Sequence, residues 1–395
     1  MAIRAAPRCE WPISRVRHLL LAALALAGSA AAGVLPEDRA DLLYHRYDGG
    51  GVTIDGPSLL VRKSFLEKFS VSGNFYMDFV SSASIDVVTT ASPYEEERTQ
   101  WSLGADAIRG KTIYSLGFTN SEESDYQSDT AYFGLSQDLF GDLTTVSLGY
   151  SRSWDTVLRR AASGSGVDPT FEEDTDRRQY RIGVSQILTK NLIIGATFEA
   201  ITDEGFLNNP YRSVRYVDSG SGTGYSFEAE IYPRTRTSNA VALSSRYFLP
   251  YRAAVRGEYR FFTDTWGIDS HTAEIGYTHP WEPKWIFDVK YRFYTQSSAD
   301  FYSDLFPRAQ AQNFEGRDKE LATFTSNTIG FGASYEFPGG WPRFVQKGTL
   351  NVRFDYIIFD YKDFRDLRVT GLAPGTEPLY GFNAYVLQLF ASIWF

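Results

Sequence analysis

The chain ends on the stretch Tyr385-Val386-Leu387-Gln388-Leu389-Phe390-Ala391-Ser392-Ile393-Trp394-Phe395. In an extended strand successive side chains point to opposite faces, so every second residue of this stretch lies on one largely apolar face. An exposed Trp-Phe end would promote aggregation in water. The stretch therefore predicts a terminal β-strand that pairs with another strand and is covered by something apolar, for which we expect lipid. The buried last strand of a soluble sandwich is the alternative.

Alternation of apolar and polar residues recurs from Phe69 onward, for example around Phe75, Leu148 and Val289. We count about fourteen such strands. Short links lie near residues 109, 140, 189, 250, 281 and 340, and long polar stretches cover residues 81–98, 120–128, 155–176, 202–236, 264–270, 296–322 and 362–379. Short turns that alternate with long loops are typical of outer-membrane barrels. Residues 67–395 are thus predicted to form an all-β, transmembrane up-and-down antiparallel β-barrel.

The N-terminal region divides into two predicted segments. Residues 1–32 carry four arginines, then an apolar run from Leu19 to Ala27 and a small-residue stretch, which is typical of a cleaved secretory signal peptide. Residues 33–66 contain glycine clusters and short β-like runs. They are interpreted as a periplasmic extension, a segment that enters the lumen, or one more strand pair. The last of these would raise the strand count to 16.

Two resemblances indicate the expected cellular location. The terminal strand resembles that of bacterial outer-membrane barrels, in which the last residue, here Phe395, is the signal read by the barrel-assembly machinery. The stretches 35–40, 47–51, 81–94, 141–146, 264–268 and 300–306 are similar to the domain-of-unknown-function family numbered 3570. That family implies a place in the Gram-negative envelope and a periplasmic partner with redox chemistry, but no catalytic residue. We therefore expect the outer membrane, with lipid and lipopolysaccharide as surroundings.

Composition excludes several functions. The formal net charge is −9, and it becomes −12 once residues 1–32 are removed, so nucleic-acid binding is not expected. Cys9 is the only cysteine and lies in the signal peptide, which excludes disulfides and Cys-ligated metals. The acidic stretches 122–125 and 172–176 lack the ligand spacing of a calcium loop. We predict no cofactor and no metal.

The predicted inner face is rich in charge in its second half. Its charged residues are Arg246, Arg256, Glu258, Arg260, Glu274, Asp288, Lys290, Arg292, Glu336, Arg353 and Asp355. Charges that line a pore set ion selectivity, which favours a porin-like conduit for small polar or ionic solutes. A salt-bridge network that fills a closed lumen is the competing interpretation. It would suit a structural barrel that docks a periplasmic partner.

An enzyme is not expected. After signal cleavage the only histidines are His45, His271 and His279. His271 follows Asp269-Ser270, so a lipid hydrolase at the rim can be considered, but known rim hydrolases place Ser two residues after His. That position is Ala273. His279 precedes Pro280 and is interpreted as a turn residue.

Overall fold

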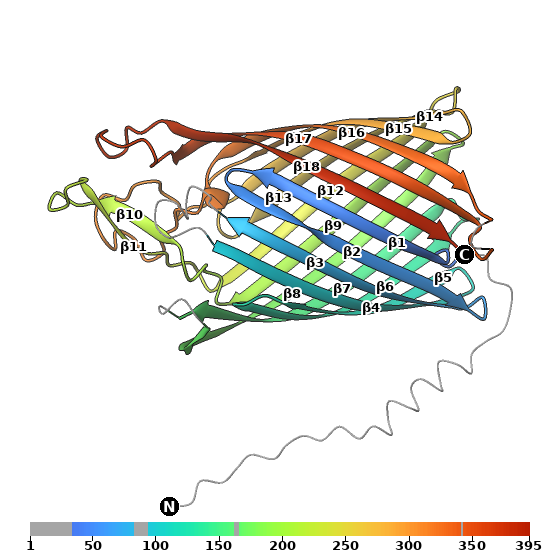
Figure 1. Cartoon of the computed structure of the whole chain (residues 1–395), viewed down its shortest axis with the longest axis horizontal. Helices are drawn as coiled ribbons and strands as arrows, with labels where there is room; N and C mark the ends of the chain where they lie inside the picture. Colours follow the sequence, from blue (N-terminus) through green and yellow to red (C-terminus); the bar gives the residue numbers. More distant parts are fainter. Residues whose placement is uncertain (1–33, 83–93, 162–165, 341–342) are drawn as a thin grey trace, which may run out of the picture.

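The computed structural model describes residues 34–82, 94–161, 166–340 and 343–395, and the predicted signal peptide lies outside them. Within these residues sixteen antiparallel strands close into one barrel (Figure 1). The barrel strands are β1 Arg39–Gly49, β2 Val52–Phe65, β3 Phe69–Ser82, β4 Tyr94–Arg109, β5 Thr112–Glu122, β6 Tyr126–Leu139, β7 Thr144–Arg160, β8 Val167–Thr189, β9 Leu192–Gly205, β12 Thr235–Phe248, β13 Ala254–Asp264, β14 Asp269–Trp281, β15 Trp285–Gln296, β16 Phe324–Pro338, β17 Lys347–Arg365 and β18 Leu379–Trp394. A hairpin of β10 (Ser213–Val217) and β11 (Tyr225–Ala229) and the short 3-10 helix η1 (Lys319–Leu321) lie in the loops.

The strand count of fourteen is wrong, and the alternative of sixteen is confirmed. Residues 39–65 are not a separate segment, because they form β1 and β2 of the wall. β1 pairs with β18 through Arg39↔Trp394 and with β2 through Gly49↔Val52, so the barrel closes only through this pair. Gly50 and Gly51 form the turn between the two strands with positive φ, and Pro57 lies inside β2. Glycine and proline usually mark loops, so the sequence pattern did not identify β1 and β2 as a strand pair. The sandwich alternative is also wrong, because one sheet closes on itself.

The outer surface of the wall is apolar, as the alternation predicts. Phe75 is 46% exposed, Leu148 43% and Val289 44%, and each alternates with residues of the opposite face. Leu389 on the terminal strand belongs to the same exposed set. So large an exposed apolar area on a folded chain marks a surface that contacts lipid.

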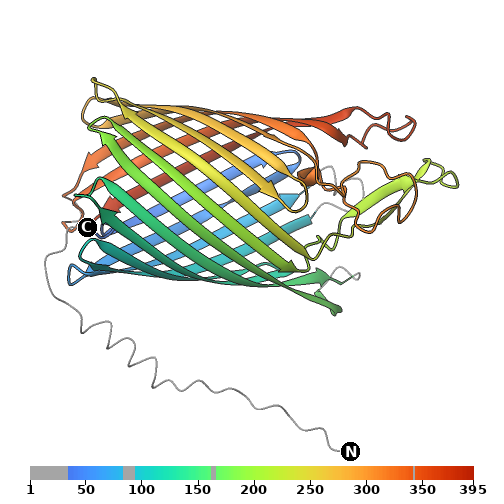
Figure 2. The same cartoon turned by 180° about the vertical axis from the view of Figure 1, so that it is seen from behind.

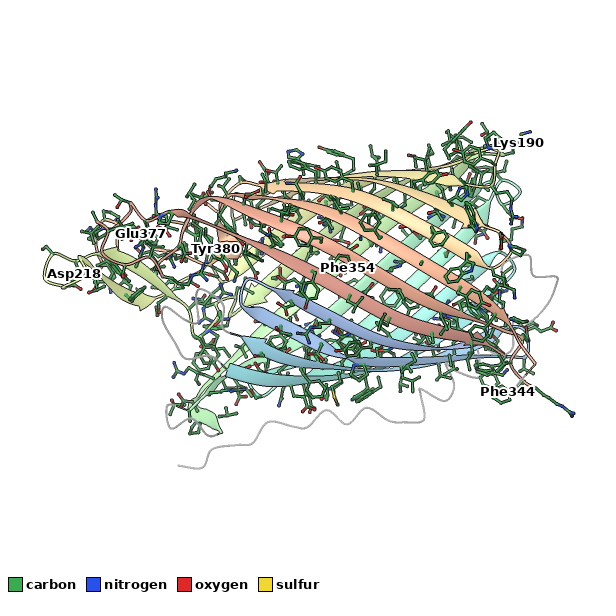
Figure 3. The ribbon with its side chains drawn as sticks, turned by 45° about the horizontal axis from the view of Figure 1, so that its top comes forward. Lys190, Asp218, Phe344, Phe354, Glu377 and Tyr380 are labelled. Carbon is green, nitrogen blue, oxygen red and sulfur yellow. The ribbon has the colours of Figure 1, made fainter. Side chains whose placement is uncertain are left out.

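The two ends of the barrel differ. One end carries the short turns, the chain around residue 34 and the terminal Phe395, whereas the opposite end carries the long loops (Figures 1 and 2). In Figure 3, Lys190 and Phe344 mark the short-turn end and Asp218 and Glu377 the loop end. β7 and β8 continue into the predicted loop 155–176, so that loop is shorter than expected. Across the described ranges no helix is long and apolar enough to cross a bilayer.

Four loops at this end fold together into a compact unit, which we name the cap. It comprises residues 206–234, 265–268, 297–323 and 366–378, together with the adjoining ends of β17 and β18. Its apolar side chains form two buried clusters, namely Tyr232, Trp266, Ile268, Ala299, Phe301 and Leu321, and Ala322, Tyr361, Phe364 and Tyr380. A backbone bridge between Tyr216 and Phe306 ties the β10–β11 hairpin to the loop after β15. The hydrophobic core therefore lies in the cap and not within the wall.

Candidate functional site

The charged residues predicted for the lumen lie on the inner face of the wall. On β13, Arg256, Glu258 and Arg260 alternate with outward residues such as Tyr259, which is 44% exposed. The same alternation places the other eight residues, which are Arg246 on β12, Glu274 on β14, Asp288, Lys290 and Arg292 on β15, Glu336 on β16, and Arg353 and Asp355 on β17. Figure 3 shows Phe354, between the last two, on the outer side. Glu336 lies at the short-turn end, apart from the rest.

Glycines let some of these charges meet across an intervening strand. Lys290, Gly330 and Asp355 lie in one row of β15, β16 and β17, and the Lys290 ammonium is 2.7 Å from the Asp355 carboxylate. A Cβ at Gly330 would stand 2.3 Å from Asp355 Oδ1 and 2.5 Å from Lys290 Cε. Only glycine leaves room for such a pair, so the pair lies flat against the wall.

Arg256 also reaches an acidic partner across an intervening strand at a glycine. Its guanidinium Nη1 lies 2.6 Å from Asp288 Oδ2 on β15, two strands away, and its Nε lies 3.4 Å from Glu274 Oε1 on β14. A Cβ at Gly276 of β14 would stand 2.3 Å from Arg256 Cζ. Two acidic partners thus neutralise Arg256 along the wall, and the pairs do not extend across the lumen.

A third pair of this kind escaped the sequence reasoning. His45 of β1 reaches over Gly56 of β2 to Asp78 of β3, with 2.7 Å between His45 Nε2 and Asp78 Oδ1. The His45 ring stacks on Tyr76 with 5.1 Å between ring centroids. Glycine between a basic and an acidic residue on sequential strands was the available signal, but it requires knowledge of the register.

Other cations of the inner face stay without an acidic partner. Arg246, Arg292 and Arg353 are exposed, and so is Arg181 on β8, which sequence reasoning missed. No ion pair within 4.0 Å joins any of the four to a carboxylate of the described chain. Arg260, by contrast, lies 3.6 Å from Glu199 on β9, a second residue that was missed. The exposed cations are therefore available to a solute in the lumen.

The opposite half of the inner wall carries hydroxyl groups instead. Ser102 of β4 accepts a hydrogen bond from Thr119 of β5 at 2.9 Å, and Ser153 of β7 lies 3.0 Å from Ser128 of β6. These strands, β3 to β7, hold few inward charges at mid-height. The lumen is thus charged on one side and hydroxyl-lined on the other.

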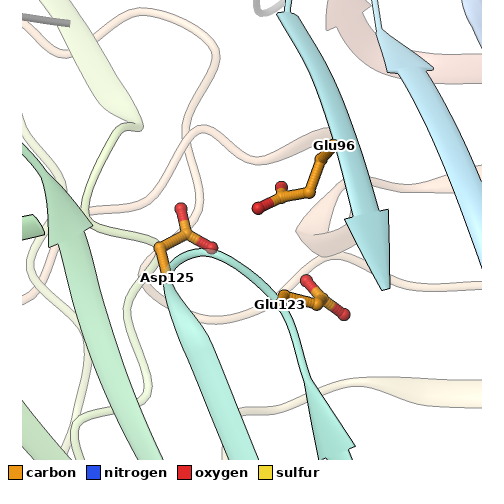
Figure 4. Close-up of side chains that lie close together, drawn as sticks. All are labelled: Glu96, Glu123 and Asp125. Atoms are coloured by element: carbon orange, nitrogen blue, oxygen red, sulfur yellow. The ribbon is translucent and has the colours of Figure 1, made fainter. Parts of the chain in front are cut away.

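A cavity of about 1140 Å³ opens where the lumen meets the cap. Glu96, Glu123 and Asp125 line it, and one carboxylate oxygen from each lies within 4.8 Å of the other two (Figure 4). Such a group could hold a cation, although Arg160 already contacts Glu96 at 3.3 Å. Burial raises the pKa of both Glu123 and Asp125. Tyr211 of the cap donates a hydrogen bond to Asp125 at 2.6 Å, which ties the cap to the rim of β5 and β6.

The cap is held by a dry ionic network. Arg215 has no exposed surface and donates from Nη1 to Glu377 Oε1 at 2.6 Å and from Nε to the Asp304 carbonyl at 2.9 Å. Arg317 binds the Asp304 carboxylate at 2.9 Å from its other side. Burial alone would lower the pKa of Arg215, but hydrogen bonds and charge from Glu377 and Asp304 raise it. The network fixes three loops that are far apart in sequence.

The residues considered for a rim hydrolase do not converge. His271 lies on the outer face, where its Nδ1 is 2.7 Å from the Tyr259 hydroxyl and its ring packs against Phe261. Ser270 is buried on the opposite face of β14. The interpretation of His279 as a turn residue is wrong, because His279 and Pro280 lie within β14 and pair with β15. His279 Nδ1 lies 2.9 Å from the Tyr277 hydroxyl.

The proposed assembly signal is integrated in the folded wall. The backbone N–H of Phe395 donates to the Asp38 carbonyl at 3.3 Å, and the Lys63 ammonium lies 5.1 Å from the centre of its ring. Trp394 donates from its indole nitrogen to Glu37. The terminal strand is thus paired on both sides, with β1 and with β17.

The closed antiparallel wall with an apolar outside and a charged inside defines the class as an outer-membrane type of β-barrel. The family described as protein of unknown function (DUF3570) matches residues 84–363, so the chain belongs to that family. No curated protein matches the chain.

Several solved structures are similar at low sequence identity. A bacterial polysaccharide outer membrane secretin is 10% identical, with 91% of this chain and 100% of that chain covered and a TM-score of 0.47. The outer membrane protein OmpT of Vibrio cholerae is 10% identical, with 90% and 98% covered and a TM-score of 0.43. The P. putida toluene transporter TodX is 9% identical, with 92% and 93% covered and a TM-score of 0.41. Similarity at this level carries no argument about what this chain does.

Proposed function

We propose that the protein is a porin-like conduit for small polar or ionic solutes in the outer membrane of a Gram-negative bacterium. Export through a cleaved signal peptide, insertion by the barrel-assembly machinery through Phe395, and contact with lipid and lipopolysaccharide belong to the same proposal. The apolar belt supports the membrane location, because a soluble barrel would gain nothing from it.

One observation carries the transport function: the lumen charges are arranged along the wall and stay wet. A salt-bridge plug would require buried partners for Arg246, Arg292 and Arg353, yet these side chains are exposed. The pairs that do form are held flat by Gly276 and Gly330. The loops that form the cap gather at one end of the barrel (Figures 1 and 2). A solvated, charge-lined interior is what a conduit for polar solutes needs.

Conductance in a planar bilayer tests the proposal. The mature chain from residue 33, refolded and shown to be folded by its heat-dependent gel mobility, should give discrete ohmic steps in KCl. Heat-denatured protein in the same detergent is the control. Folded protein without conductance would favour the closed barrel that docks a periplasmic partner.

The free arginines also predict the direction of selectivity. Across a KCl gradient the reversal potential should have the sign of an anion-selective channel, since cations without acidic partners dominate the charged half of the lumen. Arg246→Glu combined with Arg292→Glu should move it toward cations. A triple change of the paired residues Arg256, Glu274 and Asp288 to Gln, Gln and Asn should move it much less, because these three residues together carry a net charge of only −1.

A further inference from the structure

A recess of about 320 Å³ opens on the inner wall between β7 and β14. From its position and lining we infer that the recess is a binding subsite for a small anion that carries several hydroxyl groups, such as a sugar acid or a sugar phosphate. The inference rests on the proposed conduit, whose solute it specifies.

Hydroxyl groups line one side of the recess. They come from four neighbouring strands, as Thr145 and Ser147 of β7, Ser185 of β8, Thr197 of β9 and Ser244 of β12. A hydroxyl can donate to one solute hydroxyl and accept from another, so a row of them matches a polyhydroxy chain without a fixed pattern. This side alone would suit a neutral sugar equally well.

Two glycines make the recess hollow. A Cβ at Gly183 would stand 2.5 Å from Ser147 Oγ, and a Cβ at Gly195 would stand 2.7 Å from Ser244 Oγ. Gly183 pairs in register with Ser147, and Gly195 pairs with Ser244, so each glycine clears the space beside a hydroxyl. Any larger side chain at these positions would fill the floor and push the hydroxyls away.

The charged side of the recess selects an anion. Arg256 lies there but is occupied by Glu274 and Asp288, whereas Arg246 is exposed and pairs with no carboxylate of the described residues. A guanidinium binds carboxylate or phosphate through two parallel hydrogen bonds. Glu258, the neighbouring acid, would repel the anionic group but can accept hydrogen bonds from hydroxyls. The geometry therefore orients a solute with its acid group at Arg246 and its hydroxyls toward Ser244 and Glu258.

Current block by added solutes tests the subsite through the conducting protein. Gluconate should reduce single-channel current saturably, at concentrations at least about tenfold below those needed for glucose or propionate. Glucose lacks the acid group and propionate lacks the hydroxyl groups, so each can make only part of the contacts. Glucose 6-phosphate separates a phosphate from a carboxylate as the preferred acid group. Equal block by glucose would point to a neutral-sugar site, and equal block by propionate to general anion attraction. Either result would overturn the inference.

Two variants assign the effect to the recess. Arg246→Gln should weaken gluconate block by about tenfold or more, whereas Arg246→Lys should retain part of it. Arg353→Gln, on β17 and outside the recess, removes the same charge and is the matched control. A loss of the same size in Arg353→Gln would mean that net lumen charge, and not the recess, governs the block.

Calorimetry of gluconate binding to the refolded protein in detergent separates this inference from the proposed function. Binding that Arg246→Gln abolishes, in a protein that does not conduct, would remove the conduit and leave the subsite. Conductance without measurable binding or block would remove the subsite and leave the conduit.

Discussion

Arginine and acidic side chains pair in two regions of this molecule, with different surroundings. In the cap, Arg215 has no exposed surface and its partners Asp304 and Glu377 are almost fully buried. On the lumen wall, Arg256 keeps 30% of its side chain exposed and Asp288 keeps 27%. A dry ion pair cannot lose one partner without a large penalty, whereas water replaces a lost partner on the wall. The same residue types therefore fix structure in the cap and stay adjustable in the lumen.

This difference also separates the two glycine roles. Gly276 and Gly330 make space so that long side chains lie along the wall. In the cap, positive φ is the reason for glycine at Gly267, where φ is +86° and an added Cβ would also stand 2.3 Å from Asp300 Oδ1. Glycine on the wall thus leaves room for ion pairs between alternate strands, and glycine in the cap permits a tight turn.

Removal of the cap arginine should have the largest effect. Arg215→Met leaves Asp304 and Glu377 buried with one cationic partner fewer, and we expect the cap to lose roughly 3–5 kcal/mol of stability. Hydrogen exchange of residues 206–234 would measure the loss while the wall stays intact. Arg368→Met is the matched control, because Arg368 keeps 51% of its side chain exposed in its pair with Asp366 of the same cap, and that pair should contribute about 1 kcal/mol or less. Equal effects of the two changes would contradict the distinction between dry and wet pairs.

The wall could be predicted from sequence and the cap could not, for a physical reason. The alternation of apolar and polar residues along a strand identifies its two faces from adjacent residues alone. Phe75, Leu148 and Leu389 could therefore be assigned to the outer surface from the sequence. Arg215 meets Asp304 and Glu377 across 89 and 162 residues of chain, and nothing near Arg215 indicates those partners. The stretches 264–268 and 300–306, which resemble the DUF3570 family, were the signals from this region. The first contains Trp266 and Ile268 of the cap, and the second contains Phe301 and Asp304.

A buried acid of the cap should make the cap sensitive to pH. Burial and the nearby Asp318 raise the pKa of Glu230 to about 7, although the Tyr232 hydroxyl donates to its carboxylate at 2.6 Å and the Arg317 N–H at 2.7 Å. Because the folded cap holds this proton more tightly than the unfolded chain, its stability should fall as pH rises from about 4.5 to 7, by about 3 kcal/mol, and then level off.

Exchange of residues 206–234 at pH 4.5, 6 and 7.5 measures this slope. Glu230→Gln keeps an acceptor for Arg317 and should remove most of the pH dependence of cap stability. The slope of stability against pH in the wild type, minus the slope in the variant, gives the contribution of the Glu230 carboxyl group. An identical slope in Glu230→Gln would assign the pH dependence to another group.

The candidate site was only partly predictable. All eleven predicted charges lie on the inner face, because alternation fixes the face, but their pairing depends on register. Arg256 and Arg260 are neutralised by neighbours, while Arg246 and Arg292 are not, and no local pattern separates the two kinds. Arg181 on β8 and Glu199 on β9 were missed, although the alternation along their strands places both on the inner face. The recess was missed because it depends on Gly183 lying beside Ser147 and on Gly195 lying beside Ser244, and the sequence does not show which residues of neighbouring strands lie side by side.

The smallest effect is expected for a wet pair of the wall, and it completes the comparison with the cap. Lys290 and Asp355 keep 26% and 25% of their side chains exposed at 2.7 Å, so Lys290→Gln should lower the stability of the barrel by about 1 kcal/mol or less. Asp355→Asn should cost a similar amount, and the double change should cost little more than either single change. A double-mutant cycle by urea unfolding in lipid vesicles gives the coupling energy. Gly330→Ala is a geometric test of the same pair, because its Cβ would stand 2.3 Å from Asp355 Oδ1 and force the pair apart without any change of charge. Coupling of several kcal/mol would show that water does not reach this part of the lumen, and a wall that is as dry as the cap could not conduct ions.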